Sequence, residues 1–592
     1  MRRREEVPPL QKWNTEALYP DSEEWEKEYD RVAGTGFSGI TSWKGRLAQG
    51  ADKVRALLEE MFAIGEVLDR LLTYAHLRAD EDVGNDENKA LYERARLLTN
   101  AYRTETAWIE PELLALSPKE FSTYSEEKEL QPFRFYLERI RARKPHTLST
   151  ESEQLLSLGA RSLATPSKAF SMLNNVDLTF PHAETEKGEP KELTYGLYSL
   201  YMHSPDRVLR KSAFLRFHER YGAMENTATE LLSGAVHGHL FRAKARHYPT
   251  ALDAALEPDR IDPAIYRNLI ATVREGLPSL HGYVKLRKKM LGVPTLHAYD
   301  LQAPLMADTE RVFSYEEAKE AVLASVAVMG PEYTEILRRG LNEERWVDPF
   351  ENKRKRSGAY SSGCYGTLPY ILMNFHGTER DVSTLSHEAG HSMHTYLSNR
   401  TQPYQYAEYT IFLAEIASTF HEELLFRYLL TNARSEEEKR YFIERKINGI
   451  VATLFRQTQF AEFELRLYTL AEEDVPITPG RLKEIYRELS REYYGSDLTL
   501  DPETEVEFLR IPHFYANFYV YQYATGISAA YTFAQRVCEG DARDRDDYMR
   551  LLSSGSSDYP LNLLVKSGVD LRDRRIVRSL IDRFDELVSL LS

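Results

Sequence analysis

Apolar residues recur at three- and four-residue spacing over most of the chain, with charged residues between them. The pattern is clear in VRALLEEMFAIGEVLDRLLTYAHL (54–77), in residues 206–246, and in nearly everything from Ala407 onward. Such a period places one apolar stripe along an α-helix, so that this face is buried and the charged face meets water. The pattern therefore predicts a mainly α-helical protein.

Two segments depart from this period. Residues 176–196 have short β-prone ends around a Gly-, Pro- and Glu-rich middle, which predicts a hairpin. Residues 357–378, SGAYSSGCYGTLPYILMNFHGT, are rich in Gly and Tyr, which favours extended strands and turns directly before a histidine cluster. No repeat or low-complexity linker marks a boundary. We place one between Phe180 and Thr194, giving an N-terminal helical domain over 1–190 and a catalytic domain over 191–592.

The length and charge of the chain limit its class. At 592 residues it can bury a large core or form two lobes. A formal charge of −15 argues against nucleic acid or an anionic membrane as partner and leaves peptides possible. The two cysteines, Cys364 and Cys538, lack metal-type spacing and are expected to be reduced thiols. With no long apolar run, we expect a cytoplasmic protein.

The stretch LSHEAGHSMH (385–394) carries the main chemical signal. His387, Glu388 and His391 form an H-E-x-x-H pattern, whose i,i+4 spacing places both imidazoles on one helix face, where one Zn²⁺ can bridge them. We expect Asp381 to be the N-cap. An apolar stripe is then expected on the face opposite to His387, His391 and His394, formed by Val382, Leu385, Ala389, Met393 and Tyr396. The alternative is a solvated helix face that merely collects imidazoles.

A catalytic zinc keeps three protein ligands and one open position, so a third ligand is needed. Glu415, the only acid in the apolar run from Ile411 to Ala417, is the candidate, because a lone carboxylate on a buried helix is costly unless paired or bound to metal. The alternatives are a salt bridge from Glu415 to an arginine, and His394 as the ligand. Further candidates, expected to orient the ligand imidazoles, are Ser418, Thr419 and Glu422.

Several motifs together resemble one family. TLSHEAGHSMH followed by AEIASTF is similar to the thimet-oligopeptidase-like zinc metallopeptidases, and most of all to bacterial oligoendopeptidase F. The resemblance covers most of the chain through WNTEALYP, YDLQAPL, the 357–378 stretch and IPHFYANFYVYQYATGIS. It implies two helical lobes around a deep active-site channel, a small β-sheet next to the zinc helix, one Zn²⁺ per chain, and cleavage of internal bonds in short peptides.

The resemblance also suggests roles for catalytic side chains. Glu388 is expected to act as general base on zinc-bound water and later to pass the proton to the leaving amine. His513 matches the family histidine that faces the substrate, and the tyrosine-rich turn after it, with Tyr515, Tyr519, Tyr521 and Tyr523, matches the one whose phenols contact the oxyanion. Tyr523 is favoured and Tyr519 comes next; for any one tyrosine, and for His513, a purely structural role is the alternative.

The glycine-rich strand raises a separate possibility. An extended peptide can pair with an exposed strand edge, and Gly363 and Gly366 would permit its close approach. These glycines could equally serve a tight turn, and His376 is expected to be a loop residue. Two rival functions stay open: a zinc hydrolase acting on a non-peptide acyl substrate, and a helical binding protein with a structural metal. A structural zinc site usually has four Cys or His ligands and no neighbouring base, unlike the cluster at His387.

Overall fold

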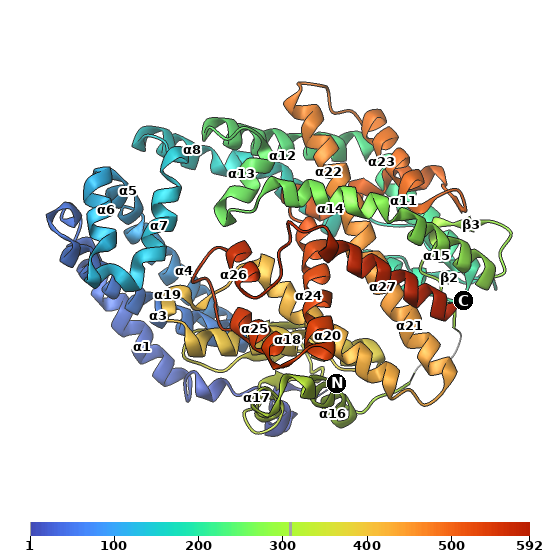
Figure 1. Ribbon diagram of the computed structural model, residues 1–592, viewed down its shortest axis with the longest axis horizontal. Coiled ribbons are helices and arrows are strands. Elements are labelled where there is room, and N and C mark those ends of the chain that lie inside the picture. The colour runs from blue at the N-terminus through green and yellow to red at the C-terminus, as the bar shows by residue number, and fades with distance from the viewer. Residues whose placement is uncertain (1, 307–310) are drawn as a thin grey trace. The chain divides into compact units, whose positions relative to one another are not determined.

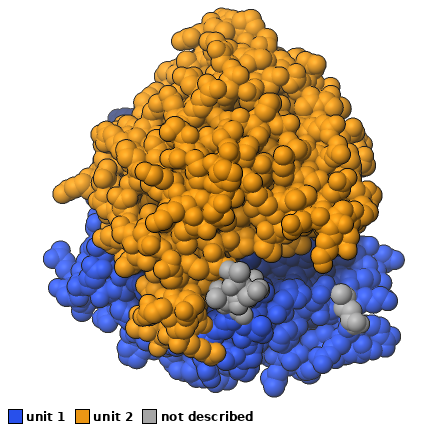
Figure 2. Space-filling model, turned by 90° about the vertical axis from the view of Figure 1, so that its right-hand side faces the viewer, with its two compact units in different colours: residues 1–144, 310–428, 533–568 blue, residues 145–309, 429–532, 569–592 orange. Residues whose placement is uncertain are grey.

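The computed structural model describes residues 2–306 and 311–592. The chain is mainly α-helical, as the apolar period predicts (Figure 1). Its described part divides into two compact units, each assembled from three stretches of chain and coloured separately in Figure 2. Unit 1 comprises residues 1–144, 310–428 and 533–568; unit 2 comprises 145–309, 429–532 and 569–592. None of the described helices has the length and apolarity needed to cross a membrane.

The α-helices of the two units have the following bounds. Unit 1 holds α1 Ser22–Thr35, α2 Ser38–Thr41, α3 Ala51–Glu81, α4 Asp86–Thr106, α5 Ile109–Ala115, α6 Pro118–Glu126, α7 Arg134–Ala142, α16 Tyr315–Ser325, α17 Pro331–Leu341, α18 Glu379–Thr401, α19 Tyr404–Ala407, α25 Ala542–Leu552 and α26 Pro560–Lys566. Unit 2 holds α8 Thr150–Leu163, α9 Thr165–Met172, α10 Tyr195–Met202, α11 Arg207–Ala223, α12 Glu225–Ala245, α13 Ala251–Leu256, α14 Pro263–Glu275, α15 Leu277–Met290, α21 Glu436–Ile450, α22 Arg456–Glu472, α23 Pro479–Tyr494 and α27 Arg575–Leu591. Two helices cross a border between the units along the chain, α20 Ile411–Thr431 and α24 Tyr521–Glu539.

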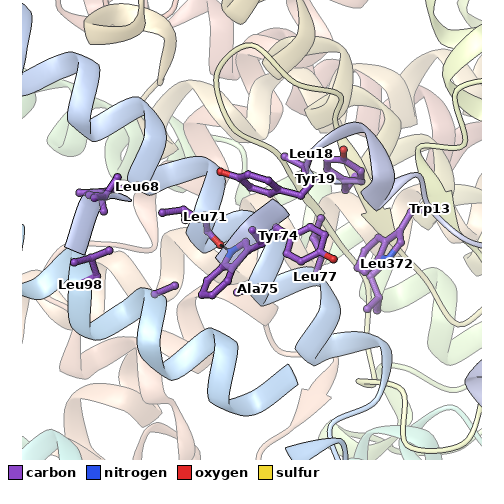
Figure 3. Packing of buried hydrophobic residues seen from close by; sticks show 14 of the residues in the cluster. Trp13, Leu18, Tyr19, Leu68, Leu71, Tyr74, Ala75, Leu77, Leu98 and Leu372 are labelled. Carbon is purple, nitrogen blue, oxygen red and sulfur yellow. Dashed lines mark hydrogen bonds between the residues drawn. The ribbon is translucent and has the colours of Figure 1, made fainter. Parts of the chain in front are cut away.

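A large apolar cluster in unit 1 joins the N-terminal segment, helices α3 and α4, and strand β6 Tyr370–Leu372 (Figure 3). Trp13 and Trp25 are almost fully buried in it. Both indoles keep a hydrogen-bond partner: Trp13 Nε1 donates to Glu81 Oε1 at 2.7 Å, and Trp25 Nε1 donates to Leu71 O at 2.9 Å. The cluster thus packs residues from the first hundred positions against a strand that the chain reaches much later.

The strands are few and short. β1 Ala183–Glu184 and β2 Pro190–Lys191 pair antiparallel in unit 2, which confirms the predicted hairpin. β3 Leu296–His297 pairs in parallel with β7 Leu498–Thr499, also in unit 2.

The sheet of unit 1 confirms the extended structure predicted for residues 357–378. It has the order β4-β6-β5, with β4 Val347–Asp348 parallel to β6 and β5 Tyr360–Ser362 antiparallel to it. Ser361 is opposite Ile371 in this register. Within this sheet β5 pairs with β6 and is the edge strand, and Ser361 Oγ contacts Ser392 Oγ of α18 at 2.9 Å.

Helix α18, which carries the histidine cluster, begins one turn earlier than predicted. Thr378 is the N-cap, and Asp381, which we expected in that role, is the third helical residue. The two form a capping box: the Asp381 N–H donates to Thr378 Oγ1 at 3.2 Å, and Asp381 Oδ2 accepts from the Thr378 N–H at 3.0 Å. The predicted apolar stripe is buried at Val382, Leu385, Ala389 and Met393.

The compact units and the predicted domains divide the chain in different ways. The units are groups of residues in contact, whereas the boundary predicted near residue 190 separates domains along the sequence. That boundary therefore stays a prediction.

Candidate metal centre

Three side chains from α18 and α20 converge in unit 1. The ligand atoms of His387, His391 and Glu415 all lie within 4.8 Å of one another. His387 Nε2 is 3.2 Å from His391 Nε2 and 3.8 Å from Glu415 Oε2. A tetrahedral Zn²⁺ with bonds of about 2.0–2.1 Å separates its ligands by roughly 3.3 Å, so the spacing suits such an ion.

A glycine between the two histidines allows the helices to approach. A Cβ on Gly390 would lie 2.5 Å from Ala417 O and 2.8 Å from Ser418 Cα, closer than any side chain tolerates. A second link holds the same pair of helices, because Ser386 Oγ donates to His421 O at 3.2 Å. This close contact brings Glu415 to the imidazoles.

Glu422 orients His387, as the sequence predicted for one of three residues. Its Oε1 lies 2.5 Å from His387 Nδ1, which leaves Nε2 directed at the cluster. Burial lowers the pKa of His387, but the hydrogen bond to Glu422 and the nearby carboxylates outweigh it and raise the pKa to about 9. A carboxylate behind a ligand imidazole fixes its tautomer and increases its basicity.

Ser418 and Thr419 do not play the predicted part. Ser418 Oγ donates to Glu415 O at 3.1 Å, and Thr419 Oγ1 donates to that same carbonyl. Both hydroxyls therefore satisfy the backbone of their own helix, as Ser and Thr often do in helices. Ser418 also lies 3.4 Å from Glu415 Oε2, so its side-chain contact is with the carboxylate and not with an imidazole.

The third histidine of the cluster points elsewhere. His394 is 1% exposed and stacks on Tyr409 with ring centroids 3.5 Å apart. Tyr409 in turn hydrogen-bonds Thr395 Oγ1 at 2.7 Å and lies 3.3 Å from His391 O. His394 is therefore directed away from the group formed by His387, His391 and Glu415. Tyr409 could not be identified from the sequence, because its contact with α18 is tertiary.

Glu388 lies beside the cluster, against strand β5. Its side chain is buried, the backbone N–H of Ser361 hydrogen-bonds its carboxylate, and its Oε2 is buried without a partner. Burial raises the pKa of Glu388, and the charge of Glu415 adds to the effect. A carboxylate with a raised pKa is a better proton acceptor near neutral pH than an ordinary one. Ser361 was not anticipated from the sequence.

The other residues named from the sequence in this region lie in turns and loops near α18 or, for Glu415, pair with a histidine. Gly366 has a φ of +72°, which fits the tight-turn alternative, while Gly363 follows β5 directly. His376 is exposed in the loop before α18, as predicted, and its N–H donates to Asp381 Oδ2 at 3.0 Å. Among the described residues no arginine pairs with Glu415, whose ion-pair partner is His387 at 3.8 Å.

His513, Tyr519 and Tyr523 form a separate aromatic group in unit 2. The ring centroid of His513 is 6.0 Å from those of Tyr519 and Tyr523, which are 5.5 Å from each other. All three side chains are half-buried, and burial lowers the pKa of His513. The neighbouring tyrosines pack elsewhere: Tyr515 stacks on Phe170, and Tyr521 is buried against Tyr266.

The donor set at the centre fits zinc. Two imidazoles and one carboxylate are typical of catalytic sites that keep one position open. Burial lowers the pKa of His391 to about 3, so its imidazole is neutral at physiological pH and has a lone pair available for a metal. Unit 1 thus combines a His₂Glu cluster with an adjacent carboxylate, the arrangement of a metallopeptidase active site.

Comparisons with known proteins agree with this class. A sequence profile described as Peptidase family M3 matches residues 200–579, and one described as Oligopeptidase F matches 112–180. Oligopeptidase PepF of Bacillus subtilis is 41% identical over 98% of this chain and 87% of its own length. An oligoendopeptidase F homolog of Lactococcus lactis is 34% identical over 99% of this chain and 97% of its own.

A solved structure shows the same relationship in three dimensions. The oligoendopeptidase F of Enterococcus faecium superposes with a TM-score of 0.74 at 34% identity, covering 96% of this chain and 98% of that one. The chain therefore belongs to Peptidase family M3, and its similarity covers 87–98% of the length of these three relatives. It is a metal-dependent peptidase that hydrolyses peptides.

Proposed function

We propose that this protein is a zinc metalloendopeptidase that cleaves internal bonds of short oligopeptides. In this proposal His387, His391 and Glu415 hold one Zn²⁺ per chain. The observation that carries it is the convergence of these three donor groups within 4.8 Å, next to the buried carboxylate of Glu388. Zinc would supply Lewis acidity toward the scissile carbonyl and would acidify a water molecule.

Glu388 is the proposed general base. Its unpartnered Oε2 can accept a proton from the attacking water, while the N–H of Ser361 keeps the carboxylate in place. The protonated acid can then donate that proton to the amine of the leaving peptide. Burial raises the pKa of Glu388, which makes its carboxylate a stronger proton acceptor than an ordinary one.

Substitutions can distinguish the general base from the three metal ligands. Glu388→Gln should keep zinc and lose most turnover, since the amide fills the same space without accepting the proton. His391→Ala and Glu415→Ala should lose the metal as well as the activity. A Glu415→Ala protein that holds zinc normally while His394→Ala does not would reassign the third ligand.

We further propose that Tyr523, and next Tyr519, donate to the oxyanion, with His513 facing the substrate. The grouping of these three rings, apart from the packed Tyr515 and Tyr521, supports the choice. Tyr523→Phe should lower kcat roughly 10²-fold with little change in KM, because the donor acts mainly in the transition state. Tyr515→Phe, with its ring stacked on Phe170, is the control and should retain kcat. An unchanged kcat in Tyr523→Phe would move the role to Tyr519 or remove it.

The substrate class is proposed from the strand edge and from family membership. An extended peptide can hydrogen-bond to β5 beside Glu388 without its sequence being read, which favours short flexible substrates. We also propose a channel between two lobes that admits peptides and excludes folded domains. The free thiols of Cys364 and Cys538 are compatible with the cytoplasmic location that we propose.

Substrate range can be tested directly. A mixed peptide library, analysed by mass spectrometry with and without a chelator, should show internal cleavages that disappear when the metal is removed. A peptide of about ten residues should also be cut far faster than the same sequence in a loop of a stable domain. Exclusively terminal cleavage, or equal kcat/KM for the peptide and the loop, would contradict the proposal.

A further inference from the structure

Unit 2 contains a polar cavity that the proposed chemistry does not use. Its volume is about 90 Å³, and it lies between α10, α22, α23 and the 3₁₀ segment Pro502–Arg510. A single water needs roughly 10–15 Å³ by the same measure, so the cavity has room for a hydrated or polyatomic guest. Its polar lining includes Arg456, Arg510, Glu507 and Thr504.

The charges in this cavity do not balance. Arg456 Nη2 and Arg510 Nη2 both contact the same oxygen, Oε1 of Glu507, the latter at 2.8 Å. The other oxygen, Oε2, accepts from Tyr486 OH at 2.8 Å. Two guanidinium groups thus share one carboxylate, and among the described lining residues no second acid is present. The lining carries a net charge of +1.

Neighbouring groups do not offset the excess charge. Burial lowers the pKa of Arg456, but the charge of Glu507 outweighs it, so that the pKa rises and the group stays cationic. The same two effects act on Arg510, with the same outcome. His218, which is 1% exposed nearby, is neutral because burial lowers its pKa to about 4. Glu505 is already paired with Arg487 at 3.1 Å.

Two donors at the cavity wall lack partners. Thr504 is 7% exposed, and its Oγ1 is buried without a hydrogen bond. Nε of Arg510 is also buried without a hydrogen bond. Buried donors are almost always satisfied in folded proteins, so a hydroxyl and a guanidinium N–H left open at one cavity indicate a missing acceptor. An anion would satisfy the donors and neutralise the charge together.

We infer that this cavity binds one small monovalent inorganic anion, held by Arg456, Arg510 and Thr504. One negative charge matches the net charge of the lining, whereas a dianion would leave an excess and would face the carboxylate of Glu507. Guanidinium and hydroxyl donors suit a halide, which has no directional requirement. Such an anion would tie α22 to the 502–510 segment and stabilise unit 2.

Chloride is the probe for a solution test with the full-length protein. Thermal unfolding is followed from 5 to 500 mM sodium chloride, with sodium gluconate, an organic anion far larger than a halide, keeping the ionic strength constant. A specific site predicts a midpoint that rises with the logarithm of chloride concentration above Kd, whereas screening would act equally in both salts. Equal midpoints in chloride and gluconate would overturn the inference.

Substitutions at the cavity test whether the chloride dependence of unfolding arises there. Thr504→Val keeps the shape and removes the hydroxyl, so it should weaken chloride binding about five- to tenfold. Arg510→Gln removes the excess charge and should abolish the chloride dependence. The control is Arg466→Gln, taken from a network in which Arg466 contacts Glu462 and Glu488, each at 3.0 Å, and it should keep the full dependence. An undiminished chloride effect in Thr504→Val would exclude this cavity.

Bromide provides a direct view that does not require a variant to fold. Crystals grown with sodium bromide should give an anomalous peak within hydrogen-bonding distance of both Arg510 and Thr504. A cavity that holds only water under these conditions would refute the proposed site, whatever the unfolding data show.

Discussion

Gly390 of α18 lies so close to the carbonyl of Ala417 in α20 that an added Cβ would be 2.5 Å from that oxygen. This contact bears on the metal centre, because Gly390 directly precedes His391 and Ala417 lies two residues after Glu415 on the facing helix. Gly390→Ala should therefore push α20 away and lower both zinc affinity and activity, even though alanine is the better helix former by about 1 kcal/mol.

A second glycine supplies the control for this prediction. Gly282 lies inside α15, and a Cβ there meets no atom within 4 Å. Gly282→Ala should keep zinc and activity and leave stability equal or slightly higher. Zinc content after dialysis against a graded chelator measures the difference. If Gly390→Ala retained metal as well as Gly282→Ala does, the helix contact would not control the site.

The bond between His387 and Glu422 leads to a prediction about affinity. Glu422→Gln keeps the size of the side chain and removes its charge, so His387 should become less basic. Loss of such a supporting carboxylate typically lowers metal affinity 10- to 100-fold. Competition with a fluorescent zinc chelator measures this, with the exposed Glu408→Gln as control. Restoration of turnover by excess zinc would show that Glu422 acts through the metal; unchanged affinity would contradict this role.

Glu464 is predicted to position the tyrosine segment of unit 2. Its Oε1 accepts from the Phe518 N–H at 2.6 Å, and Phe518 has a φ of +53°, a left-handed conformation that few non-glycine residues adopt. Burial raises the pKa of Glu464 well above its usual range. Glu464→Leu should release the turn before Tyr519 and lower kcat by up to about 10²-fold.

The conservative variant distinguishes positioning from general damage. Glu464→Gln keeps the size of the side chain and an acceptor oxygen for the Phe518 N–H, and should keep kcat near the wild-type value. KM and the thermal midpoint are measured alongside. If Gln and Leu lowered kcat equally, the hydrogen bond to Phe518 would not be the relevant contact.

Buried neutral histidines predict acid lability. Burial lowers the pKa of His218 and His239 to about 4 and that of His421 to about 3. Because these values lie below the 6.5 of an unfolded chain, their stabilisation is complete above pH 6.5 and is lost as the pH falls toward 4. Each contributes up to about 1.4 kcal/mol of lost stability per pH unit.

Urea unfolding between pH 7.5 and 5 measures how the free energy of unfolding changes with pH and so tests this prediction. His239→Gln removes one of these groups and should make the pH dependence shallower, while His182→Gln, at an exposed position, should leave it unchanged. Identical slopes in all three proteins would mean that His239 is not a neutral buried histidine.

The local sequence pattern was sufficient to predict the helices, the two strand segments and the H-E-x-x-H motif, since each depends on residues near one another in the sequence. Glu415 could also be chosen from the sequence as a ligand candidate, because an isolated acid in an apolar helix needs a partner. The cap was misplaced because Thr378 and Asp381 belong to one capping box, and helical periodicity alone does not say which of the two comes first.

Contacts between segments far apart in the sequence could not be predicted from it. Ser361 of β5 reaches Glu388 of α18, and Tyr409, in the loop before α20, stacks on His394 of α18, so neither pairing has a sequence spacing that identifies it. The same holds for the tyrosines of unit 2. Their spacing left four candidates, and packing separated Tyr515 and Tyr521 from the pair around His513.

The apolar cluster of unit 1 has a consequence for the nascent chain. Trp13 and Leu98 share that cluster with Leu372, so 274 residues (372 − 98) must be translated between the last helical contributor and the strand that covers it. At about 5–20 residues per second, the ribosome needs roughly 15 to 55 seconds for that stretch. Throughout this interval the first hundred residues present apolar surface with no final partner. During synthesis, this protein should therefore depend on chaperones that hold its N-terminal helices until the strand emerges.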